Sequence, residues 1–226
     1  MATRSIALGH EFDLLHDDDE ESVVGSPPHQ GAIVVLDTGL NLCAHRRGLP
    51  WFVGNQQPIL IPREGYGPPR RLLPDIWVHP TLTPTGRSPL LLAADYPPAL
   101  VIEVASPSTV ARDADPAAPG NKVRAYEALG VAEYLVFDPV GDLLGGPVRA
   151  WRERAGGYVL WEPDAAGRWA SAALGIAFRP QGLLLRIYDQ DGRLVPTIDE
   201  QDARIAALEE ELRRLRGGAG GESSPA

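Results

Sequence analysis

A strand–helix–strand pattern between residues 99 and 138 constrains the fold more than any other part of this chain. The apolar run at 100–105 predicts a strand, and a loop rich in Pro and Ala follows it. Residues 121–129 predict a helix that ends before a glycine, and residues 133–137 predict a second strand. Because such crossovers are right-handed and compact, we expect the two strands to be parallel neighbours or near neighbours.

A single carboxylate interrupts the first of these strands. Residues 100–105 read LVIEVA, and a strand covered on both faces normally reads as a continuous apolar run. An ionised glutamate at position 103 is costly there unless it is paired or binds a metal. Strand alternation places Val101, Glu103 and Ala105 on one face. Glu103 is therefore a candidate functional residue, and the alternative is a half-exposed strand on which Glu103 faces water.

The remaining segments predict a mixed α/β sheet flanked by helices. Residues 29–44 are compatible with a helix, and the later short apolar runs are typical of antiparallel strands joined by tight turns. The further predicted strands are 51–54, 59–62, 75–79, 147–151, 158–161, 176–178 and 183–187.

The C-terminal segment predicts an amphipathic helix over 196–217. Its apolar residues follow the spacing of a coiled-coil seam: Ile198, Ile205, Leu208, Leu212 and Leu215. Because short isolated helices are marginal, this helix is not a strong dimeriser by itself. Both self-association in a homodimer and docking on its own domain are open.

The charge is uneven along the chain and divides it into parts. The net charge is −9, but residues 22–198 hold 16 acids and 16 bases. We expect an acidic N-terminal segment at 1–25, one α/β domain at 26–195, the coiled-coil-like helix, and a disordered tail at 218–226. Five arginines between 46 and 71 face one glutamate and are candidates for phosphate contact.

Lys122 is the only lysine of the chain, whereas the other 20 basic residues are arginine. A lysine is a compact ammonium that addresses one phosphate oxygen or one water, and its pKa moves readily. It lies at the start of the predicted helix after the Glu103 strand, with Tyr126 one turn further on. Lys122 is therefore a candidate catalytic residue, and the alternative is a lysine on a solvated helix face.

A second carboxylate, Asp75, follows a proline at the mouth of the apolar strand 75–79. Pro-Asp alone is common in turns. Together with Glu103 and Lys122, however, it supplies the minimum for metal-assisted phosphodiester hydrolysis. Two carboxylates hold Mg²⁺, the metal activates a water, and the lysine orients or deprotonates that water or stabilises the developing charge.

These residues carry a family resemblance. PDIWV at 74–78, ALVIEVASPST at 99–109 and GVAEYLVFDP at 130–139, with Lys122 between the last two, resemble the PD-(D/E)XK nuclease superfamily. The chain is most similar, over about residues 26–190, to a bacterial branch of restriction-endonuclease-like proteins long known as a domain of unknown function. The resemblance implies a restriction-endonuclease-like mixed sheet.

The resemblance also implies roles for individual residues. Asp75 and Glu103 correspond to the metal-binding carboxylates and Lys122 to the catalytic lysine, with Mg as cofactor and Mn as a substitute. The usual lysine position, two residues after the second acid, is an alanine here; in this branch the following helix supplies the lysine. Asp113 and Tyr126 match positions often seen in the branch, where a supporting or a structural role is open.

His29 fits the helix start seen in relatives, and we interpret it as a hydrogen-bonding residue of that start and not as a site residue.

The sequence thus predicts a cytoplasmic, Mg-dependent endonuclease acting on DNA. A single cysteine, Cys43, excludes an intramolecular disulfide, and no apolar run is long enough for a signal peptide or a membrane span. Two alternatives remain open: an inactive nucleic-acid-binding module of the same fold, and an interaction scaffold that uses the C-terminal helix. A glycoside hydrolase explains the paired carboxylates but neither the lysine nor the scarcity of aromatic residues.

Overall fold

The computed structural model describes residues 26–61, 70–82, 90–91 and 97–218. The expected acidic segment and most of the expected C-terminal tail therefore lie outside the described residues. The elements in chain order are α1 (Pro27–Arg47), β1 (Phe52–Asn55), β2 (Ile59–Ile61), β3 (Arg70–Leu72), β4 (Ile76–His79), β5 (Leu90–Leu91), β6 (Leu100–Val104), α2 (Val110–Ala114), α3 (Lys122–Leu129), β7 (Glu133–Phe137), β8 (Val148–Arg154), β9 (Gly157–Leu160), β10 (Trp169–Ser171), β11 (Ile176–Gln181), β12 (Leu184–Tyr188) and α4 (Ile198–Gly218).

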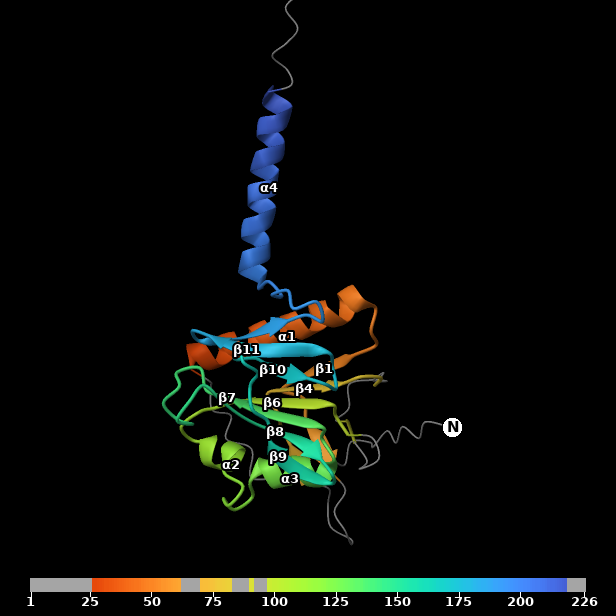
Figure 1. The fold of residues 1–226 in the computed structure, drawn as a ribbon, viewed down its shortest axis with the longest axis vertical. Coiled ribbons are helices and arrows are strands. Elements are labelled where there is room, and N and C mark those ends of the chain that lie inside the picture. Colours follow the sequence, from red (N-terminus) through yellow and green to blue (C-terminus); the bar gives the residue numbers. More distant parts are fainter. Residues whose placement is uncertain (1–25, 62–69, 83–89, 92–96, 219–226) are drawn as a thin grey trace, which may run out of the picture.

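A six-stranded mixed sheet lies at the centre, in the order β1-β4-β6-β7-β8-β9 (Figure 1). β6 and β7 are parallel neighbours, with Leu100 opposite Glu133, and α2 and α3 connect them. The other pairings in this sheet are antiparallel. The predicted strand–helix–strand unit is therefore confirmed.

The predicted strands do not all join this sheet. β10, β11 and β12 form a separate antiparallel sheet, and β2, β3 and β5 form a third. The β10–β12 sheet packs with α1 over one face of the central sheet, whereas α2 and α3 cover the other face.

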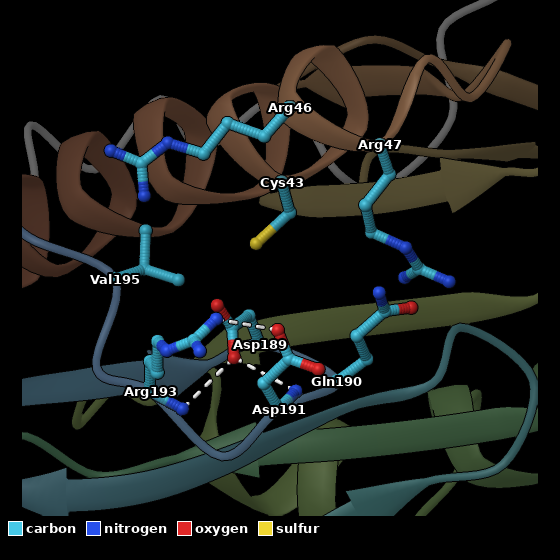
Figure 2. Close-up of a pocket in the computed structure, with 8 residues that line it drawn as sticks. All are labelled: Cys43, Arg46, Arg47, Asp189, Gln190, Asp191, Arg193 and Val195. Carbon is cyan, nitrogen blue, oxygen red and sulfur yellow. Dashed lines mark hydrogen bonds and ion pairs between the residues drawn. The ribbon is translucent and has the colours of Figure 1, made fainter.

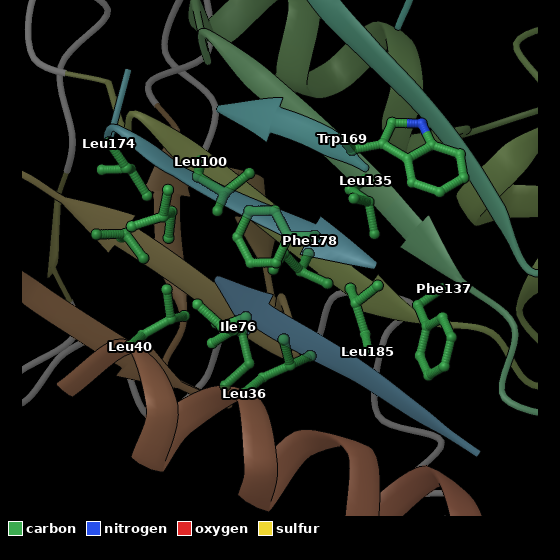
Figure 3. Packing of buried hydrophobic residues seen from close by; sticks show 14 of the residues in the cluster. Leu36, Leu40, Ile76, Leu100, Leu135, Phe137, Trp169, Leu174, Phe178 and Leu185 are labelled. Carbon is green, nitrogen blue, oxygen red and sulfur yellow. The ribbon is translucent and has the colours of Figure 1, made fainter. Parts of the chain in front are cut away.

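The hydrophobic core consists of two clusters, one on each face of the central sheet, and β6 is therefore buried on both faces. Leu100 and Ile102 pack with α1 and the second sheet in one cluster, shown in part in Figure 3. Val101 and Ala105 pack in the other cluster, under α2 and α3. Each fully buried large side chain contributes about 1.5–3 kcal/mol through loss of apolar surface from water. The predicted alternation along this strand is correct, and the half-exposed alternative for Glu103 is wrong.

The helix α1 extends beyond its predicted bounds at both ends, and the short helix α2 was not predicted. α1 begins at Pro27, two residues before the start of the predicted helix; proline is well tolerated in a first turn because its missing N–H has no helical partner there. It ends before Gly48, whose φ of 61° is left-handed. The loop expected after β6 contains the short helix α2.

α4 projects away from the domain (Figure 1). Its large apolar side chains are exposed, so docking on its own domain, one of the two alternatives for this segment, is wrong. Within the described ranges, no helix combines the length and the apolar character needed to cross a bilayer.

Candidate active site

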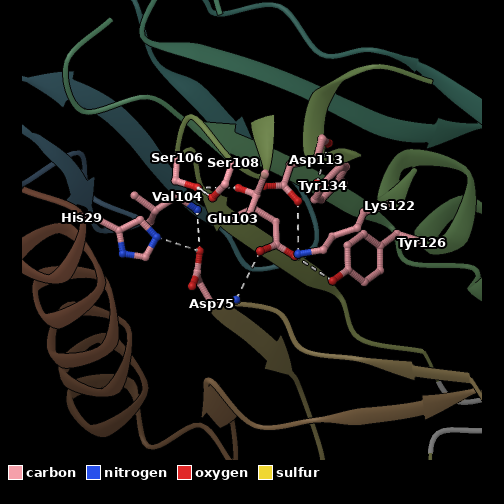
Figure 4. Close-up of polar contacts among 11 residues, drawn as sticks. His29, Asp75, Glu103, Val104, Ser106, Ser108, Asp113, Lys122, Tyr126 and Tyr134 are labelled. Atoms are coloured by element: carbon pink, nitrogen blue, oxygen red, sulfur yellow. Dashed lines mark hydrogen bonds and ion pairs between the residues drawn. The ribbon is translucent and has the colours of Figure 1, made fainter. Parts of the chain in front are cut away.

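Four charged side chains meet beside the carboxyl end of β6 (Figure 4). Asp75 precedes β4, Glu103 lies in β6, Asp113 lies in α2 and Lys122 begins α3. All three residues of the predicted site, together with the proposed supporting residue Asp113, therefore share one location.

Asp75 lies opposite Glu103 because the antiparallel register of β4 and β6 pairs Ile76 with Ile102. The carbonyl of Asp75 accepts the Gln56 N–H at 2.9 Å on the β1 side, but towards β6 the residue does not continue the backbone ladder. Instead, its Oδ2 accepts a hydrogen bond from the Val104 N–H at 2.8 Å, and its own N–H donates to Glu103 Oε2 at 3.4 Å. These bonds fix the two carboxylates side by side on one face of the sheet.

Lys122 is held between two carboxylates. Its Nζ lies 3.1 Å from Glu103 Oε1 and 3.1 Å from Asp113 Oδ1, and the lysine is only 5% exposed. It occupies the first position of α3, after the N-cap Asn121, whose side chain accepts the Arg124 N–H at 2.8 Å. A helix N-terminus disfavours a cation, so the two carboxylates offset that cost.

Two buried tyrosines donate hydrogen bonds to residues of the carboxylate cluster. The Tyr126 hydroxyl donates to Glu103 Oε1 at 2.8 Å, and the Tyr134 hydroxyl donates to the backbone carbonyl of Asp113 at 2.7 Å. The two rings are in contact, with centroids 4.9 Å apart. Tyr126 thus contacts the cluster directly, whereas the family resemblance left a supporting or a structural role open.

His29 approaches the same place from the other side. Its Nε2 lies 3.6 Å from Asp75 Oδ2, and its buried Nδ1 has no hydrogen-bond partner among the described residues. The expectation that His29 is not a site residue is therefore wrong, because its side chain lies beside Asp75 (Figure 4). The sequence holds no signal for it, because the contact depends on how α1 packs against β4.

The cluster has more negative than positive charge. Burial raises the pKa of Glu103 to about 8, although the nearby Lys122 opposes the shift, and burial also raises the pKa of Asp75. For Lys122, burial alone lowers the pKa, but the charges of Glu103 and Asp113 outweigh burial and raise it. Three carboxylates around one ammonium leave a deficit of positive charge that a proton or a cation relieves.

The donor set fits Mg²⁺. Among the described residues, no three His, Cys, Asp or Glu side chains are grouped to hold a metal. Mg²⁺ does not require such a group, because it keeps several waters and binds through one or two carboxylates plus substrate phosphates. Asp75 Oδ1 has no hydrogen-bond partner in the described part of the chain, and Glu103 is next to it. These two residues are the ones that would hold the ion.

A pocket of about 290 Å³ lies elsewhere, between the end of α1 and the turn after β12 (Figure 2). It is lined by arginines and aspartates and by Cys43, whose thiol has a pKa raised to about 11, mainly by burial. The thiol is therefore protonated near neutral pH and is a poor nucleophile. None of the four clustered charged residues lines this pocket.

The chain is similar to a known protein family and to a solved structure. A family named Uma2 and described as "Putative restriction endonuclease" matches residues 10–181, which include the whole β6–α3–β7 block and the four clustered residues. A crystal structure described as "a putative nuclease belonging to DUF820 from Anabaena variabilis ATCC 29413" is similar over 62% of this chain and 71% of that chain, with 14% sequence identity and a TM-score of 0.43. No curated protein matches the chain significantly.

The family match spans well over half of the sequence and agrees with the resemblance carried by its motifs. The chain therefore belongs to the Uma2 family of restriction-endonuclease-like proteins.

Proposed function

We propose that this protein is an Mg²⁺-dependent endonuclease that hydrolyses phosphodiester bonds in DNA. Asp75 and Glu103 bind the metal, with Mn²⁺ as a substitute, and Lys122 acts at the attacking water or the scissile phosphate. One observation carries the proposal. The only lysine of the chain is buried against Glu103 and Asp113, in a cluster where three carboxylates outnumber this single ammonium group.

The protonation state of Lys122 decides among its candidate roles. Because Glu103 and Asp113 raise its pKa, the amine keeps its proton near neutral pH and is a poor base. It therefore donates hydrogen bonds, either orienting a water or stabilising charge on a phosphate oxygen. When bound, the metal supplies Lewis acidity and lowers the pKa of a bound water.

Glu103 and Asp75 are held in place before any ligand arrives. The Val104 N–H fixes Asp75 Oδ2, and the Tyr126 hydroxyl fixes Glu103 Oε1. The oxygens that remain, Asp75 Oδ1 and Glu103 Oε2, are the ones without a strong hydrogen bond. This arrangement reduces the reorganisation needed to bind a cation.

The first test measures metal binding. Calorimetric titration with Mg²⁺ and Mn²⁺ should show binding by the wild type and its loss in Asp75→Asn and Glu103→Gln. Asp142→Asn and Glu162→Gln are matched controls, since both residues are exposed and lie outside the cluster. Equal binding by Asp75→Asn and the wild type would reject the proposed ligand.

The second test separates the lysine from the metal. With supercoiled plasmid, we expect Lys122→Met to bind Mg²⁺ and to lose nicking. Removing one partner from a buried ion pair costs about 3–5 kcal/mol, so circular dichroism must show that the variant is folded. Lys122→Arg keeps the charge but places a planar fork in the site, and it should fold and also lose most of its activity.

Two outcomes would contradict the proposal in different ways. Nicking retained by folded Lys122→Arg and Lys122→Met would remove the lysine from the mechanism. DNA binding by the wild type without metal binding or nicking would favour the alternative of an inactive nucleic-acid-binding module.

A further inference from the structure

The helix α4 presents an apolar face that its own domain leaves uncovered. The large side chains of this face are between 48% and 65% exposed: Ile198, Ile205, Leu208, Leu212 and Leu215. The helix has 21 residues, and a single helix of this length is only marginally stable in water. Something must cover this face if the helix is to persist.

Hydrogen bonds attach the first turn of α4 to the domain, and the remaining turns of the helix point away from it. Thr197 and Glu200 form a capping box: Glu200 Oε2 accepts the Thr197 N–H at 2.8 Å, and Thr197 Oγ1 accepts the Glu200 N–H at 3.3 Å. The Glu200 carboxylate also receives two hydrogen bonds, at 2.9 and 2.7 Å, from the buried Arg186 of β12. The domain thus holds the first turn and touches little beyond it.

We propose that α4 pairs in parallel with α4 of a second copy of this chain. Ile198, Ile205 and Leu212 occupy the a positions of three heptads, and Gln201, Leu208 and Leu215 occupy the d positions. The central heptad, with Ile205 at a and Leu208 at d, has the β-branched and leucine pattern that favours two-stranded coiled coils.

The charges beside this seam select the parallel orientation. Arg204 and Glu211 stand at g positions, and Glu209 and Arg216 stand at e positions. In a parallel pair, each g residue faces the e residue five positions later in the second helix. Arg204 then faces Glu209 of the second copy, and Glu211 faces Arg216 of the second copy, so both pairs attract.

These four charges are also available for pairing between copies. Among the described residues, none of the four forms an ion pair within the chain, whereas Glu210, on the outer face, binds both Arg213 and Arg214. An antiparallel pair would instead place e opposite e and g opposite g. In the register that pairs Ile205 with Leu208, Glu209 would face Asp202 of the second copy and repel, and only Arg204 with Glu211 would attract. The parallel pair, in which both facing pairs attract, is therefore favoured.

The proposal is tested on the full chain by sedimentation equilibrium across a wide range of concentration. We expect reversible dimerisation by the wild type and its complete loss in the double variant Leu208→Glu and Leu212→Glu. The matched control, Ala203→Glu with Ala207→Glu, adds the same charge on exposed positions outside the seam and should dimerise like the wild type. All substituted residues are exposed, so the domain should remain folded.

Charge reversal then tests the orientation. Glu211→Arg alone and Arg216→Glu alone should each weaken the dimer by about tenfold or more, and the two together should restore it. A monomeric wild type, or a dimer that survives the seam variant, would overturn the proposal. Failure of the double reversal to restore dimerisation would overturn the parallel arrangement.

Discussion

At the scale of single residues, the burial of Glu103 links stability to pH. The pKa of its carboxyl group is raised from 4.5 to about 8, chiefly by burial. Between these values the unfolded chain loses a proton that the folded chain keeps, so stability falls as the pH rises through this window and levels off above it. Each pH unit costs at most about 1.4 kcal/mol.

We therefore expect the melting temperature of the metal-free protein to fall as the pH rises from 4.5 to about 8. Glu103→Gln should flatten this slope, because an amide does not titrate. Thermal melts followed by circular dichroism in the presence of a chelator measure it, with Glu162→Gln as the control. Equal slopes in Glu103→Gln and the wild type would show that Glu103 titrates at its ordinary pKa.

Tyr126 provides a residue-scale test of how the carboxylate is positioned. Tyr126→Phe keeps the buried ring but removes the hydrogen bond to Glu103 Oε1. Above pH 8, where Glu103 is ionised, a lost hydrogen bond to this charged group costs roughly 1.5–3 kcal/mol. We expect a loss of this size in chemical denaturation together with weaker Mg²⁺ binding.

The control for Tyr126→Phe is Tyr158→Phe, since the buried Tyr158 hydroxyl has no hydrogen-bond partner in the described part of the chain. Its removal should change the free energy of unfolding little and leave metal binding unaltered. Mg²⁺ affinity unchanged in Tyr126→Phe would mean that this tyrosine serves packing only.

The sequence could single out Glu103 and Lys122 as candidates, because each residue is unusual in its local context, although it left a half-exposed Glu103 open. An acid in an apolar strand and one lysine among arginines are visible without coordinates. The ion pair of Lys122 with Asp113 and the contact of His29 with Asp75 could not be predicted. Both depend on how helices pack, which local patterns do not encode.

At the scale of elements, the pairing of the edge strand β1 with β4 holds Asp75 at the start of β4. Gly54 lies opposite Trp77 in this pair, and a Cβ at Gly54 would lie 2.1 Å from Trp77 Nε1. Gly54→Ala must displace the buried indole, which also donates to the Gln57 carbonyl at 3.1 Å. Such overpacking costs about 1–3 kcal/mol.

We expect Gly54→Ala to lower the free energy of unfolding in a urea titration and to weaken Mg²⁺ binding at the adjacent Asp75. Gly31→Ala is the contrasting variant: a Cβ at this helical position meets nothing within 4 Å. Because alanine is the better helix former, it should gain roughly 0.5–1 kcal/mol. Equal stability of the two variants would contradict the packing argument.

Elements were predictable where the pattern was long. The parallel β6–β7 unit and α4 follow from apolar runs and regular spacing. β3, β5 and α2 are two to five residues long and carry no periodic signal of their own. The separation of β10–β12 from the central sheet was also beyond prediction, since it depends on how these strands pack with α1 against that sheet.

At the scale of the whole molecule, a parallel α4 pair would place both domains at the same end of one coiled coil. Each α4 is attached to its domain through Arg186 and the capping box at Thr197, so each domain stays close to the N-terminal end of its own helix. Two candidate sites would then act as neighbours, and one dimer could reach both strands of a duplex.

This arrangement predicts a change of product with protein concentration. Above the dissociation constant of the dimer, wild-type protein with Mg²⁺ should convert supercoiled plasmid to linear DNA with little nicked intermediate, because both strands are cut before release. Leu208→Glu with Leu212→Glu should only nick, at an unchanged rate per site, since both leucines are exposed on α4. Gel analysis of the three plasmid forms over time measures this difference. If the seam variant forms linear DNA as rapidly as the wild type, each domain cuts both strands alone. Absence of nicking by both proteins would contradict the proposed carboxylate site and not the coiled coil.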